Sequence, residues 1–250
     1  MTGRWLPGPD PGPGAEVRLF CLPYAGGGAG AFRGWGRLAP PHVAVCPVEL
    51  PGRGTRLAEP AHRRLSPLLR ALAAGLAPAL DRPYALFGHS LGALLACELT
   101  RVFAADGRPP VHLFVSGAAA PAVPRTRPAV HAASDEDVIR ELRSLNGTPP
   151  ELLADEELMA LMLPTLRADF AVLETYEHRA GPPLPVPITA FGGSADPAVP
   201  PPALTGWRRE SAVGARVQVF PGDHFFLHDA AAEVVAAVAG TLGPARAALR

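Results

Sequence analysis

Apolar residues recur along the chain as short continuous runs, and stretches with a helical period separate these runs. The apolar runs have the length of buried strands and cover residues 17–23, 43–50, 84–87, 111–116, 186–191 and 216–220. The helical periods cover residues 65–80, 91–105 and 230–242. Continuous apolar strands that alternate with helices are typical of a parallel sheet covered on both faces. We therefore expect an α/β fold with a mostly parallel central sheet.

One stretch, residues 134–178, shows helical signals with no strand between them. Ser134, followed three positions later by an acidic residue, predicts a helix start. The proline pair at 149–150 predicts a second start, and Pro164 should kink or interrupt the helix that follows. A helical segment inserted between two strands of an open sheet usually covers the carboxyl ends of the strands. We interpret residues 128–180 as a helical lid.

A length of 250 residues fits one domain of this kind together with its lid. Hydrophobic residues make up 48% of the chain and charged residues 18%, which is the balance of a globular protein. With 31 prolines and 26 glycines, however, the chain lies close to the level typical of disorder. Residues 3–14 are especially rich in both. We therefore expect residues 1–16 to form a flexible tail and residues 17–250 to form a single domain.

The charge balance excludes broad classes of partner. The 23 basic residues equal the 23 acidic residues, and every fixed cation is an arginine because the sequence contains no lysine. This balance argues against binding to nucleic acid or to a membrane surface, both of which need a basic face. The chain has no apolar run long enough to span a membrane and no apolar leader segment. Cys21, Cys46 and Cys97 lack the spacing of a disulfide framework or a metal site, so we expect a cytoplasmic protein without a metal.

The sharpest chemical signal is the pentapeptide Gly88-His89-Ser90-Leu91-Gly92, which follows an apolar strand and opens a helix. In this context G-x-S-x-G forms a tight turn that exposes the serine hydroxyl above the sheet. The free N–H groups of the following helix then point toward developing negative charge. The motif predicts that Ser90 is a catalytic nucleophile.

A serine nucleophile needs a base, and the base needs an acid that orients it. His224 lies just after the last predicted strand, and Asp196 lies in a loop just after the strand 186–191. The order Ser90, Asp196, His224 matches that of α/β-hydrolases. Asp223 is a weaker candidate acid because it is adjacent to His224 in the sequence, and the side chain of an adjacent residue rarely makes a good hydrogen bond to Nδ1 of a histidine. His228 could pair with His224 on a metal, but no third ligand is evident.

The loop after the first strand is rich in glycine, and this composition allows two interpretations. The backbone N–H of Ala25, together with that of Leu91, could hold the oxyanion of a tetrahedral intermediate. Alternatively, the glycines at 26 and 28, with Glu49 about 20 residues further on, could form a dinucleotide site. The second interpretation leaves the serine turn and the acid–histidine pair unexplained, so we favour the first.

Taken together, the motifs resemble those of the type II (editing) thioesterases that accompany polyketide and nonribosomal peptide synthases. The stretches that carry the resemblance are residues 19–28, 48–56, 87–93, 191–197 and 221–227. The family often has His where Tyr24 stands and Met where Leu91 stands, but both changes leave the backbone donors in place. The resemblance implies an α/β-hydrolase fold and hydrolysis of acyl thioesters on the phosphopantetheine arm of acyl or peptidyl carrier proteins. It implies no cofactor, and it implies that the lid shapes an acyl chamber.

Two groups of side chains have both a structural and a functional interpretation. Apolar residues of the lid fall near helical spacing, which suits ordinary packing or contact with the acyl chain. The residues we expect at the acyl chain are Met159, Met162, Leu166, Phe170 and, outside the lid, Phe225. Four arginines follow the second strand, and they either form a solvated face or dock an acidic carrier protein: Arg53, Arg56, Arg63 and Arg64.

Other functions compatible with the same serine, acid and histidine remain open. A small-molecule carboxylesterase or lipase would use the same three residues, and so would a thioesterase that releases a finished product. A catalytically inactive hydrolase fold could serve as a binding module, although the intact residues argue against it. We expect a monomer, and the sequence leaves the preferred acyl chain undefined.

Overall fold

The computed structural model describes residues 3–8 and 14–243. Its centre is a six-stranded sheet with the order β2-β1-β3-β4-β5-β6, and every pairing is parallel. The strands are β1 Val17–Leu22, β2 Val43–Pro47, β3 Tyr84–His89, β4 His112–Ser116, β5 Ile188–Gly193 and β6 Ala215–Phe220. The parallel sheet predicted from the continuous apolar runs is therefore confirmed.

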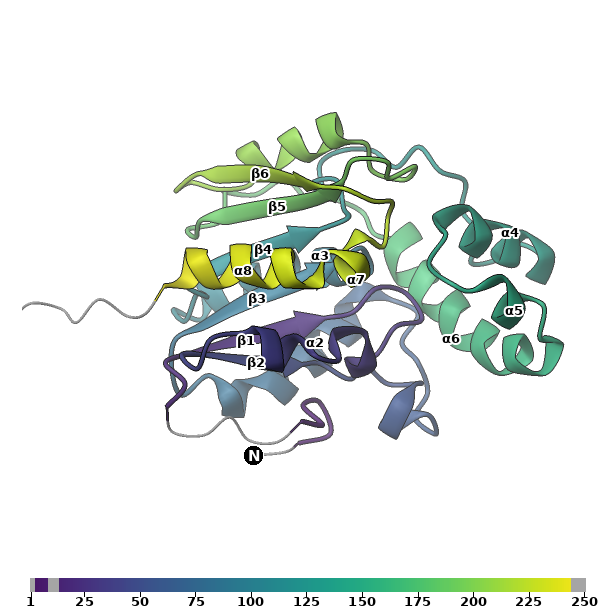
Figure 1. Ribbon diagram of the computed structural model, residues 1–250, viewed down its shortest axis with the longest axis horizontal. Coiled ribbons are helices and arrows are strands. Elements are labelled where there is room, and N and C mark those ends of the chain that lie inside the picture. Colours follow the sequence, from purple (N-terminus) through teal and green to yellow (C-terminus); the bar gives the residue numbers. More distant parts are fainter. Residues whose placement is uncertain (1–2, 9–13, 244–250) are drawn as a thin grey trace, which may run out of the picture.

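Helices cover both faces of this sheet and form two separate apolar cores. The helices α2 (Leu65–Leu76) and α3 (Leu91–Ala105) contribute to one core, whereas α1 (Trp35–Leu38) and α8 (Ala231–Leu242) contribute to the other. In Figure 1, α8 crosses in front of the strands and α3 lies behind them. The elements outside the lid are η1 Ala29–Phe32, α1 Trp35–Leu38, η2 Gly54–Arg56, α2 Leu65–Leu76, η3 Ala77–Ala79, α3 Leu91–Ala105, η4 Pro201–Arg209, α7 Phe226–Asp229 and α8 Ala231–Leu242.

The inserted segment forms three helices beyond the end of the sheet at which the strands finish (Figure 1). They are α4 Asp135–Leu145, α5 Pro150–Leu153 and α6 Glu156–Glu174. The predicted start at Ser134 is confirmed, because its hydroxyl accepts the N–H of Asp137 at 3.2 Å.

The position of the second break differs from the prediction. The chain breaks before α6, where the side chain of Asp155 caps the helix by accepting the N–H of Leu158 at 3.0 Å. Helix α6 then continues through Pro164, which we expected to interrupt it. A proline is tolerated here because its exposed position leaves the freed backbone carbonyl within reach of solvent.

The N-terminal segment is also more ordered than its composition suggests. The carbonyl oxygen of Trp5 accepts the N–H of Glu49 at 2.9 Å, and Leu6 packs beside Trp5 against the core. The Trp5 ring also lies under the guanidinium of Arg56, 4.0 Å from its centre. Residues 3–8 of the expected flexible tail therefore pack against the domain, and the half-buried Trp5 anchors them. The most proline-rich part, residues 9–13, lies outside the described residues.

The order of strands places the first two crossovers on opposite sides of β1. The chain leaves β1 for β2 on one side and then returns to β3 on the other. Open parallel sheets bind their ligands at such a switch point, outside the carboxyl ends of the strands. Here the switch lies between β1 and β3, so the glycine-rich loop after β1 and the serine turn after β3 meet there.

Two findings bear on the cysteines and on membranes. Cys21, Cys46 and Cys97 are buried thiols, and burial raises the pKa of Cys21 and Cys97 well above the ordinary value. Within residues 3–8 and 14–243, none of the helices has the length and apolar character needed to cross a membrane.

Candidate active site

Ser90 occupies the turn between β3 and α3 in a backbone conformation that non-glycine residues rarely adopt. Its φ is 54° and its ψ is −114°. The turn holds this strained residue because the N–H of Ser90 donates to the carbonyl oxygen of Ser116 at 2.8 Å. A β-carbon on Gly88 would lie 2.0 Å from the carbonyl oxygen of Gly92, so the turn requires a glycine there. Ser90 is therefore presented at the start of α3, as the motif predicts.

Asp196 and His224, from the loops after β5 and β6, form a buried pair. Nδ1 of His224 lies 2.8 Å from Oδ2 of Asp196. The other carboxylate oxygen accepts the N–H groups of Ala198 at 2.8 Å and Val199 at 3.1 Å. Because both oxygens are engaged, the carboxylate is fixed against the imidazole. This arrangement orients His224 with its Nε2 away from the acid.

His89, the residue before Ser90, packs against His224. It is fully buried, its Nδ1 lies 2.9 Å from the Ser116 hydroxyl, and its ring centre lies 5.1 Å from that of His224. Burial, together with the charges of His224 and His228, holds the pKa of His89 well below its usual value. His89 is therefore an uncharged side chain that packs against His224.

The loop after β1 comes close to the start of α3. It forms a tight turn in which the N–H of Gly27 donates to the carbonyl oxygen of Tyr24 at 2.9 Å, with Gly26 at a φ of 76°. A β-carbon on Gly92 would lie 2.1 Å from the carbonyl oxygen of Leu22. The first turn of α3 therefore rests directly on the end of β1. This contact brings the backbone of Ala25 and that of Leu91 to the same end of the sheet.

A cavity of about 570 Å³ lies between this edge of the sheet and the lid, and Ser90 and His224 both line it. Its apolar walls come from α3, η4, α6 and the connection between β4 and α4. They include Leu94, Ala119, Pro121, Phe170, Leu173 and Trp207. The arrangement can hold an extended apolar group whose reactive end lies beside the serine and the histidine.

The comparisons with known proteins agree with this geometry. Residues 17–242 match the family described as thioesterase domain. The chain belongs to the thioesterase family. It is 42% identical over 236 residues to the gramicidin S biosynthesis protein GrsT of Aneurinibacillus migulanus, covering 94% of this chain and 92% of that protein. The resemblance predicted from the motifs is confirmed.

Two solved structures are similar over nearly the whole of this thioesterase. The type II thioesterase BorB from the borrelidin biosynthetic cluster has a TM-score of 0.88 and 36% identity, covering 97% of this chain and 99% of that one. RedJ, a thioesterase from the prodiginine pathway in Streptomyces coelicolor, has a TM-score of 0.86 and 41% identity, covering 93% and 87%. The expected α/β-hydrolase fold is thus that of its relatives.

The cavity of this thioesterase includes only one of the residues that we expected at the acyl chain. Phe170 lines it, whereas Met159 and Leu166 belong to the apolar cluster that joins α6 to α4 and α5, and Met162 packs against that cluster. Phe225 instead packs on Tyr24, with ring centres 4.8 Å apart. Helical spacing identified an apolar face but did not show that it is shared between the lid's own core and the cavity.

The structure pairs His228 with the hydroxyl of Tyr24. Its Nε2 lies 3.1 Å from the hydroxyl of Tyr24, and burial lowers the pKa of His228 and raises that of Tyr24. The part of the chain that the structure describes holds no group of three or more His, Cys, Asp or Glu side chains able to bind a metal ion. Tyr24 and His228 thus join the glycine-rich loop to the loop that carries His224.

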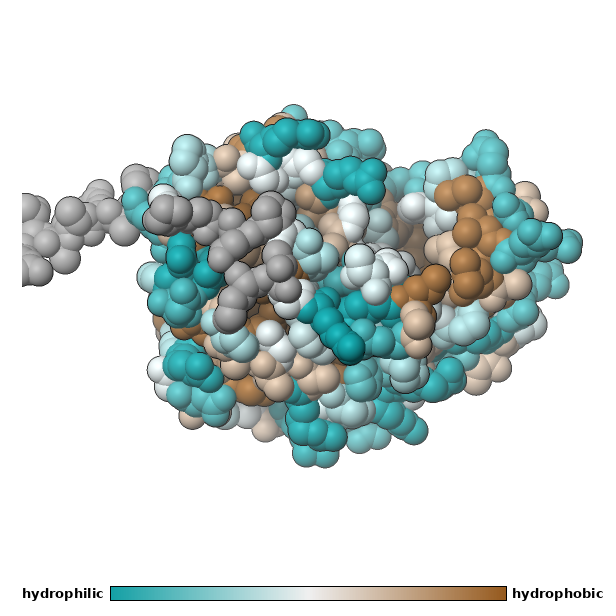
Figure 2. All heavy atoms as spheres, turned by 90° about the horizontal axis from the view of Figure 1, so that it is seen from below, coloured by the Kyte–Doolittle hydropathy of each residue, from teal (hydrophilic) through white to brown (hydrophobic). Residues whose placement is uncertain are grey.

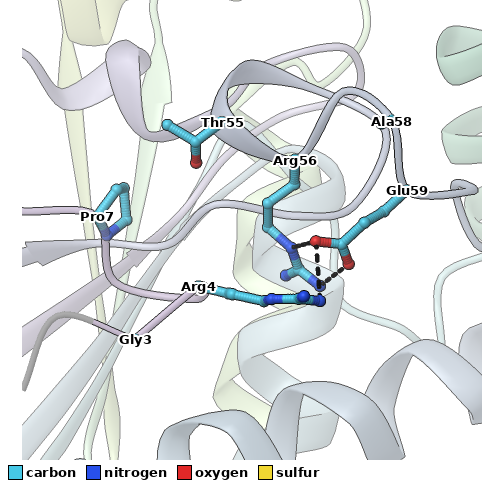
Figure 3. A pocket seen from close by; sticks show the side chains of 7 residues that line it. All are labelled: Gly3, Arg4, Pro7, Thr55, Arg56, Ala58 and Glu59. Atoms are coloured by element: carbon cyan, nitrogen blue, oxygen red, sulfur yellow. Dashed lines mark hydrogen bonds and ion pairs between the residues drawn. The ribbon is translucent and has the colours of Figure 1, made fainter.

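Two of the four arginines that we considered for docking are not on the surface. Arg53 and Arg56 are only 7% and 6% exposed. Arg56 donates to both carboxylate oxygens of Glu59, at 3.1 and 2.7 Å, as Figure 3 shows. Arg53 pairs with Asp169 of α6. Both the solvated face and the docking role are therefore wrong for these two residues, which are buried and paired with acidic side chains.

Arg63 and Arg64 remain exposed. Arg63 lines a groove of about 450 Å³ between the loop after β2 and α6, together with Leu57 and Leu161. These two leucines are 53% and 56% exposed. Apolar side chains are also exposed at the lid end of the molecule seen from below (Figure 2). The groove therefore combines apolar side chains with the exposed Arg63 and with Glu59, whose charge is paired with Arg56.

Sequence reasoning missed Asp169. It is 1% exposed although it carries a charge. The available signal was its position three residues after Leu166 and next to Phe170, on the apolar side of a predicted helix. A carboxylate on that side of a helix needs a buried partner, and Arg53 in the loop after β2 provides it.

Proposed function

We propose that this thioesterase hydrolyses stalled or aberrant acyl groups from the phosphopantetheine arms of carrier proteins in a polyketide or nonribosomal peptide pathway. The observation that carries the proposal is the Asp196–His224 pair, whose histidine lines the same lidded cavity as Ser90. Similarity to thioesterases of such pathways over nearly the whole chain supports the substrate class. Because all the proposed site residues come from one chain, we also propose that a monomer is active.

The proposed reaction has two steps. Oγ of Ser90 attacks the thioester carbonyl while Nε2 of His224 takes the hydroxyl proton. The carbon–sulfur bond then breaks, and the pantetheine thiol leaves with that proton. In the second step His224 takes a proton from water, whose oxygen attacks the acyl-serine ester. The free acid leaves, and the proton returns to Ser90.

Two sets of groups would stabilise the charges that develop during this reaction. The backbone N–H groups of Ala25 and Leu91 would hold the negative oxygen of both tetrahedral intermediates. Asp196 would stabilise the imidazolium form of His224, since its carboxylate is fixed 2.8 Å from Nδ1. No cofactor takes part in this scheme.

The first test is a panel of acyl-carrier thioesters of different chain lengths, assayed with the wild type and with Ser90→Ala. We expect the substitution to lower kcat by about 10⁴–10⁶-fold. An editing enzyme should accept short acyl groups on several carriers, whereas a releasing enzyme should prefer one long product. Near-normal turnover by Ser90→Ala would refute covalent catalysis at this residue.

Two further comparisons separate the alternatives. A carboxylesterase or lipase should hydrolyse an oxygen ester at least as well as the matching acyl-pantetheine thioester, so the ratio of their kcat/KM values decides between these classes. An inactive binding module should leave Ser90 unlabelled by a fluorophosphonate. Rapid labelling that Ser90→Ala abolishes would support the enzyme.

The remaining exposed arginines allow a test of carrier docking. Reversing both charges, with Arg63→Glu and Arg64→Glu, should raise KM for an acyl-carrier substrate several-fold, because charges at the rim of an interface mainly affect association. A small acyl thioester without a protein should keep its KM. Equal effects on the two substrates would contradict docking at this groove.

A further inference from the structure

A buried ion pair links the lid to the loop after β2. Nη1 and Nη2 of Arg53 lie 2.6 and 2.8 Å from the two carboxylate oxygens of Asp169, which form a bidentate pair with them. The arginine side chain is 8% exposed and the aspartate side chain 2%. Paired in this way, each charge compensates the other, and removal of either partner leaves an isolated charge inside the protein.

The same two side chains also hold the glycine-rich loop after β1. Oδ2 of Asp169 accepts the N–H of Gly26 at 2.8 Å, and Nη1 of Arg53 donates to the carbonyl oxygen of Gly27 at 3.0 Å. The guanidinium is fixed in turn by the carbonyl oxygen of Pro51, 3.3 Å from Nε and 3.2 Å from Nη2. Three segments far apart in the sequence therefore meet at one guanidinium and one carboxylate.

The anchored glycines adjoin Ala25, whose N–H is the proposed oxyanion donor. Gly26 has a φ of 76°, and a β-carbon on it would lie 2.6 Å from Cδ2 of Leu166 on the lid helix. The turn thus follows α6 closely, with Asp169 as its hydrogen-bond partner. The direction of the Ala25 N–H depends on how this turn is held, since an oxyanion donor must lie about 3 Å from the developing charge.

We propose that Arg53 and Asp169 are positioning residues that set the geometry of the oxyanion loop, so that the lid helix supports catalysis as well as covering the cavity. The inference rests on the proposed covalent mechanism and on the role of the Ala25 N–H in it. Neither residue lines the cavity that contains Ser90 and His224. Substitution of either residue should therefore weaken the stabilisation of the tetrahedral intermediate without weakening the binding of the substrate.

The informative variant is Asp169→Asn, which keeps the size of the side chain and one acceptor oxygen. In one orientation its NH₂ group faces Nη2 of Arg53, and in the other it faces both Nη1 of Arg53 and the N–H of Gly26. Arg53 therefore loses an acceptor and its charged partner in either orientation. We expect kcat for a small acyl thioester to fall about 10- to 100-fold, with KM changed less than threefold. An alkyl trifluoromethyl ketone, which forms a tetrahedral adduct with the serine, should bind more weakly by the same factor as kcat/KM falls.

Glu59→Gln is the matched control, because Glu59 is the partner of the neighbouring buried arginine, Arg56. Its bonds reach Arg56 and Arg4 but no residue of the glycine-rich loop or of α6. We expect Glu59→Gln to leave both kcat and the affinity for the ketone within twofold of the wild type, even if its melting temperature falls. A conservative Asp169→Glu, which retains the charge, should recover part of the activity lost in Asp169→Asn.

Three outcomes would overturn the inference. One is a folded Asp169→Asn variant with unchanged kcat, and another is a loss of kcat with unchanged affinity for the ketone. The third is an equal loss in Glu59→Gln, which would indicate general destabilisation. Failure of the proposed function itself looks different, because Ser90→Ala would then retain activity whatever the variants of Asp169 do.

Discussion

The two ends of the central sheet differ in how their polar and charged side chains are held. At the end where the strands begin, buried polar side chains, the charged Arg18 among them, bond to backbone carbonyls or to a hydroxyl. The guanidinium of Arg18 donates to the carbonyl oxygen of Ala79 at 2.6 Å, and the Tyr84 hydroxyl donates to that of Arg108. Nε2 of His112 lies 2.9 Å from the hydroxyl of Thr189. These bonds tie neighbouring strands and loops together.

At the end where the strands finish, the chain keeps features that cost stability. Ser90 has a strained backbone, and Arg53 and Asp169 are opposite charges that are both buried, whereas the acidic partner of Arg18 is 56% exposed. Such features persist only where the surrounding structure fixes them. The beginning of the sheet therefore contributes mainly to stability, whereas its other end holds reactive groups in place at some cost in stability.

After Ser90→Ala, the largest effect should come from Asp196→Asn at the finishing end. The amide oxygen would stay with the N–H groups of Ala198 and Val199, so the NH₂ group would face Nδ1 of His224. His224 would then carry its proton on Nε2 and could not accept one from Ser90. We expect kcat to fall on the order of 10³–10⁴-fold, with a small change in melting temperature. A fall of less than tenfold would contradict the proposed role of Asp196.

The next effect concerns the close contact that joins the serine turn to β1. Gly92→Ala would force a methyl group to within 2.1 Å of a backbone oxygen, which must move. We expect the free energy of unfolding to fall by about 2–3 kcal/mol, and kcat to fall because the two backbone donors separate. Urea unfolding and steady-state kinetics measure the two effects.

Gly240→Ala provides the control for this change, since it also adds a methyl group to a helical glycine. A β-carbon there meets nothing within 4 Å. Better helix propensity should therefore leave stability unchanged or raise it by up to about 1 kcal/mol. If both variants lost stability equally, close approach would not be the reason for glycine at position 92.

Local patterns predicted most of the sheet and the positions of the candidate catalytic residues. The helix expected over residues 91–105 has those bounds, because a glycine-flanked turn and a regular apolar period define it locally. Asp196 and His224 were predicted from their places after strands, and the structure brings them within hydrogen-bond distance. This inference works because the carboxyl ends of parallel strands meet at one edge.

Features that depend on distant pairing could not be predicted in the same way. Arg53 lies 116 positions from Asp169, and nothing near either residue identifies its partner. Arg56 is likewise buried by Trp5, which lies in a segment whose proline and glycine content indicated disorder. In both cases the burial of a charge was decided by tertiary contacts, which override the local composition.

The smallest effect tests the beginning of the sheet through its pH dependence. Burial, with a smaller contribution from the charge of Arg216, lowers the pKa of His112 to about 4. An unfolded histidine has a pKa of about 6.5, so the unfolded state takes up a proton first as the pH falls. The stabilising contribution of neutral His112 is therefore complete above about pH 6.5 and is lost as the pH falls toward 4.

Between pH 7.5 and pH 5, this residue should account for a loss of about 2 kcal/mol in the free energy of unfolding. His112→Gln should remove that part of the pH dependence while leaving kcat at pH 7.5 within twofold of the wild type, because the side chain lies at the end of the sheet opposite Ser90. Urea unfolding at the two pH values measures the difference. An unchanged pH dependence would show that His112 does not contribute it, and a large loss of activity would show that the two ends of the sheet are not separate in function.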